Sequence, residues 1–264
     1  MTTSATSRLR LDEAVVARGL AESRSRARAL ILAGDVTVNG AVVARAGAAV
    51  GAGDRLELAE KPRFASRGGE KLAHALGRFG LAVEGAAAAD LGASTGGFTD
   101  CLLQSGARRV YAIDVGYGLL AERLRRDPRV VVLDRTNARS LESLPEPVDL
   151  VTIDVSFISL RLVLPTAARL LRPGGECVPL IKPQFEAGPR DVGKGGVVRD
   201  PAVHRRVLVE ALAAATASGF GVLDLTASPL RGPAGNVEFL AYLRKGESSV
   251  DATALIEAAL EEAA

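Results

Sequence analysis

The sequence predicts an α/β protein in which a small α+β domain precedes a larger, Rossmann-like domain. A glycine-rich turn, DLGASTGGFTD at residues 90–100, follows a short apolar run and opens into a segment with helical spacing. Three further apolar runs, at residues 110–114, 130–134 and 148–154, each end in an aspartate. Ligands bind at the carboxyl ends of the strands in open α/β sheets, so this series of acids predicts a binding site.

The composition favours a cytoplasmic enzyme. A chain of 264 residues is long enough for one large and one small domain, and its hydrophobic fraction of 48% supports a substantial core. The first residues lack the apolar stretch of a signal peptide, and we expect no membrane span. Two cysteines, Cys101 and Cys177, predict neither a disulfide framework nor a metal site. We predict domains at 1–60 and 67–246, a connector at 61–66 and a helical tail at 247–264.

The first 60 residues have the pattern of two short helices followed by a small sheet. Apolar residues recur at helical spacing from Leu9 to Leu20, and Gly19 ends this first predicted helix. Ser23 is a suitable N-cap for a second helix that ends at Gly34. The pair Asn39 and Gly40 predicts a hairpin turn within VTVNGAVV, and residues 50–58 predict a closing strand.

Arginines are concentrated in this N-terminal segment. Residues 1–34 hold six Arg against three acidic residues, although the net charge of the whole chain is only +2. A solvated helix face and a phosphate-contacting surface both explain such a cluster. The layout helix–helix–VxVNG resembles the S4 RNA-binding domain. That resemblance makes the N-terminal RNA-contact candidates Arg8, Arg10, Arg24, Arg26 and Arg28.

A connector of mixed polarity, AEKPRFAS at residues 59–66, joins the two domains, and Pro62 argues against regular structure within it. The next residues, SRGGEKLAHAL, predict a helix that precedes the first strand of the large domain. This helix carries Lys71, and Arg67 at its start is a further RNA-contact candidate.

The glycine-rich turn predicts a cofactor site. Glycines allow backbone N–H groups to approach a ligand closely at a helix N-terminus. The sequence fits neither a P-loop nor GxGxxG, and Asp90 suits a cationic or zwitterionic ligand such as the methionine part of S-adenosylmethionine. A tight turn without a ligand would need only one glycine. The candidate residues in this segment are Asp90, Gly92, Ser94, Thr95, Gly96, Gly97 and Phe98.

Two later strand ends extend the predicted cofactor site. Asp114 lies about 20 residues beyond the glycine turn, where Rossmann-type folds place the acid that binds ribose hydroxyls. Thr136 and Asn137 follow the strand at residues 130–134, and we expect them to frame the adenine.

Lysine usage singles out a possible catalytic residue. The chain has 28 Arg and five Lys, so a Lys indicates a need for a compact or titratable amine. Lys182 follows the apolar run CVPLI, and in a parallel sheet its amine would lie beside Asp154; a surface Lys is the alternative. Glu238 precedes a late strand. We expect Lys71, Asp154, Lys182 and Glu238 to form one charged cluster that acts on a hydroxyl.

The glycine-rich segment GPRDVGKGGVVRD, residues 188–200, predicts a mobile loop. Arg190, Lys194 and Arg199 are positioned to close on RNA, and a solvated surface loop is an equal alternative. The two histidines, His74 and His204, have no metal-ligand spacing. We therefore predict no metal.

Seven motifs together resemble the TlyA family of S4-domain ribosomal RNA 2′-O-methyltransferases, often labelled hemolysins and related to the FtsJ methyltransferases. They are DLGASTGGFTD, IDVGYGLL, RTNARSL, DVSFISL, IKPQFE, GGVVRD and SPLRGPAGNVEF, and the likeness covers about residues 8–245. The family's Lys-Asp-Lys-Glu tetrad falls on Lys71, Asp154, Lys182 and Glu238. The resemblance implies methyl transfer from S-adenosylmethionine to cytidine 2′-OH groups of 16S and 23S rRNA, with ribosomal subunits as partners.

Two other function classes remain as alternatives. A hemolysin would need a signal peptide, a long apolar segment or a strongly amphipathic basic helix, and the sequence shows none of these. A non-catalytic ribosome-assembly factor would be expected to have lost part of the tetrad, whereas all four residues are present.

Overall fold

The chain divides into two compact units, Met1–Pro62 and Arg63–Ala264. The computed structural model describes residues 8–32, 34–58 and 62–263. The first seven residues of the predicted N-terminal domain lie outside this part of the chain, as do residues 59–61 of the predicted connector, among them Lys61. Residues 62–66 contain neither helix nor strand, as Pro62 predicts.

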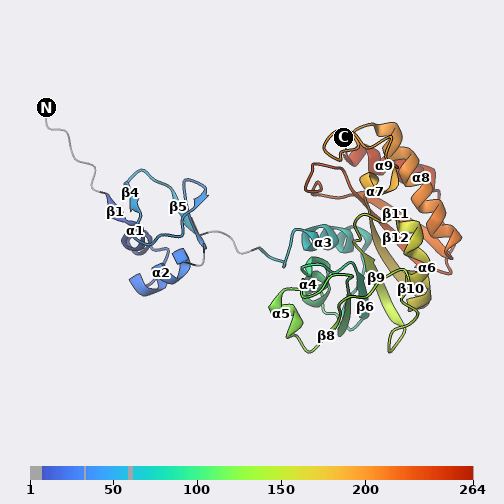
Figure 1. Ribbon diagram of the computed structural model, residues 1–264, viewed down its shortest axis with the longest axis horizontal. Helices are drawn as coiled ribbons and strands as arrows, with labels where there is room; N and C mark the ends of the chain where they lie inside the picture. Colours follow the sequence, from blue (N-terminus) through green and yellow to red (C-terminus); the bar gives the residue numbers. More distant parts are fainter. Residues whose placement is uncertain (1–7, 33, 59–61, 264) are drawn as a thin grey trace. The chain divides into compact units, whose positions relative to one another are not determined.

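The N-terminal unit is a small α+β domain (Figure 1). Its described elements are β1 (Leu9–Arg10), α1 (Leu11–Ala17), α2 (Arg24–Leu32), β2 (Val36–Val38), β3 (Ala41–Val42), β4 (Ala49–Val50) and β5 (Leu56–Leu58). β2 pairs with β3 and β5, and β1 pairs with β4. The buried core consists of Leu11, Ala14, Val15, Ala27, Ile31, Val36, Val50 and Leu56.

Several local signals of this unit are confirmed, and two are corrected. The single closing strand expected at residues 50–58 is wrong, because Val50 belongs to β4, which pairs with β1, and Leu56–Leu58 form β5, which pairs with β2 in another sheet. Asn39 (φ 53°) and Gly40 (φ 81°) both take the left-handed conformation that a two-residue hairpin requires. The Oγ of Ser23 accepts a hydrogen bond from the backbone N–H of Arg26 at 3.2 Å, which caps α2. Leu9, however, does not belong to the first helix, because it is in β1 and pairs with Val50.

The larger unit is built on a seven-stranded sheet of the described residues. Its strands are β6 (Ala87–Leu91), β7 (Arg109–Ile113), β8 (Val130–Leu133), β9 (Val148–Ile153), β10 (Leu171–Ile181), β11 (Phe220–Ala227) and β12 (Phe239–Lys245). The order across the sheet is β11-β12-β10-β9-β6-β7-β8. β12 is antiparallel to both of its neighbours, and the pairs from β10 to β8 are parallel.

Helices cover both faces of this sheet (Figure 1). They are α3 (Gly68–Phe79), α4 (Gly97–Gln104), α5 (Glu122–Arg125), η1 (Leu160–Leu162), α6 (Leu164–Leu170), α7 (Pro183–Glu186), α8 (Pro201–Ala217) and α9 (Ala252–Ala263). Side chains alternate along β6: Ala87, Ala89 and Leu91 join the core under α6, α8 and α9, whereas Ala88 joins the core under α3, α4 and α5. None of the helices in the described ranges is long and apolar enough to cross a membrane.

The chain order creates a reversal point at β6. After β6 the chain passes through α4 to β7 and then β8 on one side, and it returns to β9 on the other side. A crevice forms at the carboxyl ends of the strands on either side of such a point. The fold therefore places the loops after β6 and β9 next to each other.

Candidate active site

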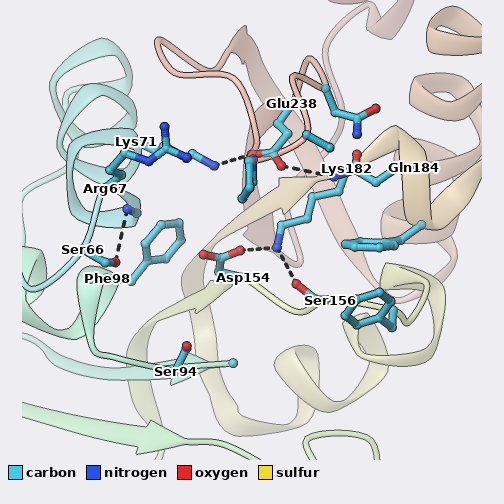
Figure 2. Close-up of a pocket in the computed structure, with 18 of the residues that line it drawn as sticks. Ser66, Arg67, Lys71, Ser94, Phe98, Asp154, Ser156, Lys182, Gln184 and Glu238 are labelled. Atoms are coloured by element: carbon cyan, nitrogen blue, oxygen red, sulfur yellow. Dashed lines mark hydrogen bonds and ion pairs between the residues drawn. The ribbon is translucent and has the colours of Figure 1, made fainter. Parts of the chain in front are cut away.

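A cavity of about 820 Å³ opens at this reversal point (Figure 2). Parts of the chain far apart in sequence supply its walls: the start of α3, the glycine turn after β6, the segments after β9 and β10, and the loop before β12. The polar and charged lining residues include Ser66, Arg67, Lys71, Ser94, Thr95, Asp154, Ser156, Lys182, Gln184, Asn236 and Glu238.

The glycine turn requires its glycines for contacts within the protein. Gly92 has φ 89°, and a Cβ there would lie 2.6 Å from the carbonyl oxygen of Asp154. A Cβ on Gly97 would overlap the Oγ of Ser66. Both glycines line the large cavity. Gly96, with φ 98°, faces away from it, and a Cβ there would meet the side chain of Leu124.

Asp90 differs from its predicted role as the carboxylate that faces a cationic ligand. Its side chain is fully buried, where Oδ2 accepts a hydrogen bond from Thr99 Oγ1 at 2.7 Å and Oδ1 accepts one from Thr152 Oγ1 at 3.1 Å. Burial, with a smaller contribution from Asp154, raises the pKa of Asp90 to about 7. Asp90 therefore stabilises the glycine turn from the protein interior, through its hydrogen bonds with Thr99 and Thr152.

A second, smaller cavity of about 290 Å³ adjoins the first. The predicted cofactor residues Asp114, Thr136 and Asn137 line it, together with apolar side chains. Asp114 accepts hydrogen bonds from the backbone N–H groups of Ser94 at 2.8 Å and Gly116 at 2.7 Å, which ties the glycine turn to the end of β7. The residues that line both cavities are Gly92, Ser94, Asp154, Ser156 and Phe157.

Lys182 and Asp154 form an ion pair between neighbouring strand ends. Lys182 Nζ lies 2.6 Å from Asp154 Oδ1 and donates a hydrogen bond to Ser156 Oγ at 3.0 Å. Asp154 follows β9 directly and Lys182 follows β10 directly, so the parallel pairing of these strands brings the two side chains together. The expected juxtaposition of Lys182 and Asp154 is confirmed.

Lys71 and Glu238 form the second ion pair of the cavity wall. Only 9% of the Lys71 side chain and 1% of the Glu238 side chain are exposed. Glu238 Oε1 also accepts a hydrogen bond from Gln184 Nε2 at 3.3 Å. The antiparallel direction of β12 brings its first residues, rather than its last, to this edge of the sheet. All four tetrad residues therefore line one cavity, as two pairs.

Several lining residues were not singled out from the sequence. Ser156 and Phe157 follow Asp154, and Gln184 and Phe185 follow Lys182. Phe157 has φ 62°, is 90% exposed and packs against the Phe185 ring with 4.9 Å between ring centroids. Their positions directly after the predicted acid and amine were the available signal, because residues just beyond a strand end lie at the binding edge.

Asn236 joins the loop at residues 188–200 to the cavity wall. Its Nδ2 donates to Gly196 O at 2.8 Å, and its Oδ1 accepts from Val198 N at 2.9 Å. Arg190, Lys194 and Arg199 are exposed on this loop. His204 contacts Val198 O through Nε2 at 3.1 Å, and burial lowers its pKa.

The RNA-contact candidates fall into different environments. Arg10 and Arg24 pair with the buried carboxylate of Asp12, and these contacts, with that of Arg10 the larger, lower the pKa of Asp12 to about 2. Arg26 and Arg28 are exposed on α2, and in the described ranges neither side chain has an ion pair. Arg8 and Lys194 are exposed, and Arg67 lines the large cavity.

Metal-ligating residues do not cluster in the part of the chain that the structure describes: no group of three or more His, Cys, Asp or Glu side chains there could hold an ion. Cys101 and Cys177 are buried free thiols. The chemical groups that the large cavity offers are two amines, the guanidinium of Arg67, two carboxylates, hydroxyls and amides.

Comparisons with known proteins agree with this architecture. Residues 64–245 match the family model for FtsJ-like methyltransferases, and residues 9–56 match that for S4 domains. The chain is 47% identical over 241 residues to the 16S/23S rRNA (cytidine-2′-O)-methyltransferase TlyA of Mycobacterium tuberculosis, covering 90% of each protein.

Two solved structures also have folds similar to that of this chain. A structure described as a hemolysin from Streptococcus thermophilus superposes with a TM-score of 0.75 at 42% identity, covering 98% of this chain and 96% of that one. A structure described as a S-adenosylmethionine-dependent methyltransferase from Listeria monocytogenes shares the fold, with a TM-score of 0.53 at 14% identity over 69% of this chain and 99% of that one. The chain belongs to the TlyA family, in which an S4 domain precedes an FtsJ-like methyltransferase domain.

Proposed function

We propose that this protein transfers the methyl group of S-adenosylmethionine to the 2′-OH of cytidine in 16S rRNA, 23S rRNA or both, in the cytoplasm. The observation that carries the proposal is the Lys182–Asp154 ion pair, which lines the larger cavity and whose Asp154 also lines the smaller one. The ion pair keeps the amine of Lys182 in a fixed position at the place where a cofactor and a ribose would meet.

The smaller cavity fits the nucleoside part of S-adenosylmethionine. The carboxylate of Asp114 has lone pairs for ribose hydroxyls beyond the two N–H groups it accepts, and Asn137 offers an amide for base edges. Ser94, Asp154 and Ser156 continue from this cavity into the larger one, so a molecule held there would extend towards the tetrad. The sulfonium supplies an already activated methyl group when the cofactor is bound.

The remaining chemistry is positioning and proton removal. In-line displacement needs the hydroxyl oxygen close to and aligned with the methyl carbon, which proximity within a closed site provides. In our proposal the ion-paired ammonium of Lys182 first releases a proton to solvent, and the neutral Nζ then orients the 2′-OH and accepts its proton. Asp154 holds the resulting ammonium, and Ser156 fixes the direction of the amine.

The other ion pair has a binding role in this proposal. Lys71 contacts the ribose or phosphate of the target nucleotide while Glu238 holds its ammonium in place. Arg67 on the rim adds a phosphate contact, and Arg8, Arg26, Arg28 and Lys194 are the other RNA contacts of the proposal.

Transfer of a radiolabelled methyl group to purified ribosomal subunits, followed by mapping of 2′-O-methylation, tests the function. We expect labelled cytidines with the wild-type protein and loss of label with Lys182→Ala. Subunit binding without methyl transfer would favour an assembly factor. Release of haemoglobin from erythrocytes without RNA methylation would favour a hemolysin.

A further inference from the structure

Both partners of the Lys71–Glu238 ion pair rest on the end of the edge strand β11. On the Glu238 side, Ser228 N donates a hydrogen bond to Glu238 O at 2.8 Å, directly after the last pair of the ladder, Ala227 with Phe239. The main chain of Glu238 is therefore held by the residue that follows β11.

On the Lys71 side, the contact runs through α3. His74 lies one helical turn after Lys71, on the same side of the helix. Its Nε2 is 3.4 Å from the hydroxyl oxygen of Thr226, a buried residue of β11. α3 packs against α4 and also against β11, so the contact with Thr226 is one of those that hold the side of the helix that carries Lys71.

One carboxylate of the C-terminal helix holds this end of β11. Glu262 Oε2 accepts hydrogen bonds from Thr226 Oγ1 at 2.7 Å and from Ala227 N at 3.0 Å. Because β11 is the edge strand of the sheet that the structure describes, its outward N–H groups have no neighbouring strand there to bond. Thr226 donates its hydroxyl hydrogen to Glu262, so the lone pairs of that oxygen are available to an N–H of His74.

The helix reaches this position by crossing the edge of the sheet. α9 packs through Ile256 and Ala259 into the core that also contains Leu225 and Ala227. Because side chains alternate along a strand, that of Thr226 lies on the opposite face of the sheet, towards α3. Glu262, near the C-terminal end of α9, therefore connects the two faces at the strand that supports the ion pair.

We propose that Glu262 is a positioning residue for methyl transfer. It holds the end of β11 and thereby sets the distance and direction between Lys71 and Glu238. This inference rests on the proposed function, since it assigns the support of that reaction's nucleotide-binding pair. The cofactor side of the site, at β6 and β7, lies on other strands and does not depend on it.

The test compares Glu262→Ala with Glu262→Gln and with Glu261→Ala. A single oxygen of Glu262 accepts both bonds, so the amide oxygen of Gln can replace it. Glu261 is the matched control, because it is the adjacent, exposed residue of α9. We expect Glu262→Ala to lower the single-turnover rate roughly tenfold or more, since small misplacements of a site are costly. Glu262→Gln and Glu261→Ala should keep the wild-type rate.

Two further measurements separate positioning from general loss of structure. We expect the S-adenosylmethionine Kd of Glu262→Ala to stay within about twofold of wild type, and its Tm to fall by no more than about 5 °C. A wild-type rate in Glu262→Ala overturns the inference. Parallel loss of rate, cofactor affinity and Tm, or a loss that Gln does not rescue, also overturns it.

Hydrogen exchange keeps this inference distinguishable from the proposed function. In Glu262→Ala, exchange should become faster at residues 68–74 and 236–240 and stay unchanged at residues 90–98. If the wild-type protein transfers no methyl group, the proposed function fails, and the exchange pattern alone decides whether Glu262 holds the Lys71–Glu238 pair. Unchanged exchange in both segments would contradict that role.

Discussion

Lys182 Nζ and Asp154 Oδ1 lie 2.6 Å apart because the residues that carry them each follow the last residue of adjacent parallel strands. Ile153 of β9 stands opposite Pro179 of β10 in the ladder, so the two strands end near the same level of the sheet. The ion pair is thus a product of strand register.

Lys182→Arg separates a proton-accepting amine from a positive charge. A guanidinium cannot act as a base and its planar shape does not match a site built around an ammonium. We expect the single-turnover methyl-transfer rate to fall about a hundredfold or more, within the range of acid–base contributions. Cofactor and subunit affinities should change little.

Lys245→Arg is the control for that substitution. Lys245 is the last residue of the antiparallel strand β12, so it lies at the end of the strands away from the cavities. Its Nζ donates to Leu171 O at 2.7 Å, and it lines neither of the two cavities. This variant should remain fully active. A near-wild-type rate for Lys182→Arg would remove the base assignment.

Gly92→Ala tests the close approach beneath the glycine turn. The new Cβ would lie 2.6 Å from the Asp154 carbonyl oxygen, so the turn or the segment after β9 must shift. We expect the S-adenosylmethionine Kd measured by calorimetry to rise at least tenfold, which corresponds to about 1.4 kcal/mol.

Gly219→Ala is a matched control for the Gly92 variant. Gly219 also has φ 89°, and apart from its chain neighbours no atom of the described residues lies within 4 Å of a Cβ placed there. It introduces the same backbone strain, of order 1 kcal/mol, without the contact at the site. If both variants weakened cofactor binding equally, the steric argument at Gly92 would fail.

Asp90→Asn should change how stability depends on pH. The pKa of Asp90 is about 7 in the folded protein against 3.8 for an unperturbed aspartate, so between these values the folded chain keeps a proton that the unfolded chain has lost. The contribution of Asp90 to the free energy of unfolding of the wild-type protein therefore falls as pH rises from about 4 to about 7. Asn cannot titrate and avoids this loss.

The measurement is the Tm difference between Asp90→Asn and wild type across pH. Other carboxyl groups contribute equally to both proteins and cancel in the difference. We expect the difference to move in favour of Asn between pH 5 and pH 8. A difference that stays constant over this range would show that Asp90 titrates normally.

Arg28→Ala should weaken subunit binding and reduce its salt dependence. Each contact with a phosphate releases counterions when RNA binds. The loss of one such contact should therefore make the slope of log affinity against log salt concentration shallower by about one. Arg205→Ala, on α8 and paired with Glu257, is the control and should leave the slope unchanged. An unchanged slope for Arg28→Ala would leave this arginine as part of a solvated helix face.

Local and periodic signals in the sequence predicted much of the fold. Apolar runs that end in an acid gave β7, β8 and β9, and the Asn39–Gly40 pair gave the hairpin. β11 and α8 were not among the predicted elements. Among the described strands β11 pairs with β12 alone, and no turn or motif in its own sequence indicates that neighbour.

The candidate site shows why side-chain direction is harder to predict than position. Asp114 and Asp154 follow the last residues of their strands and line the cavities, whereas Asp90 is still within β6. Alternation along that strand turns Asp90 into the interior, beside Thr99 and Thr152. The sequence did not locate the end of β6 to within one residue. Because side chains alternate along a strand, a shift of one residue reverses the direction of the carboxylate.

The antiparallel direction of β12 has a consequence for synthesis of the protein. Lys71 and Glu238 are 167 residues apart in the chain, and β12 must insert between β10 and β11 before they meet. A nascent chain emerging from the ribosome can complete the strands beside the smaller cavity well before residue 238 is made. The cluster of Lys71, Asp154, Lys182 and Glu238 is therefore complete only near the end of translation, and such late, long-range pairing is a slow step in folding.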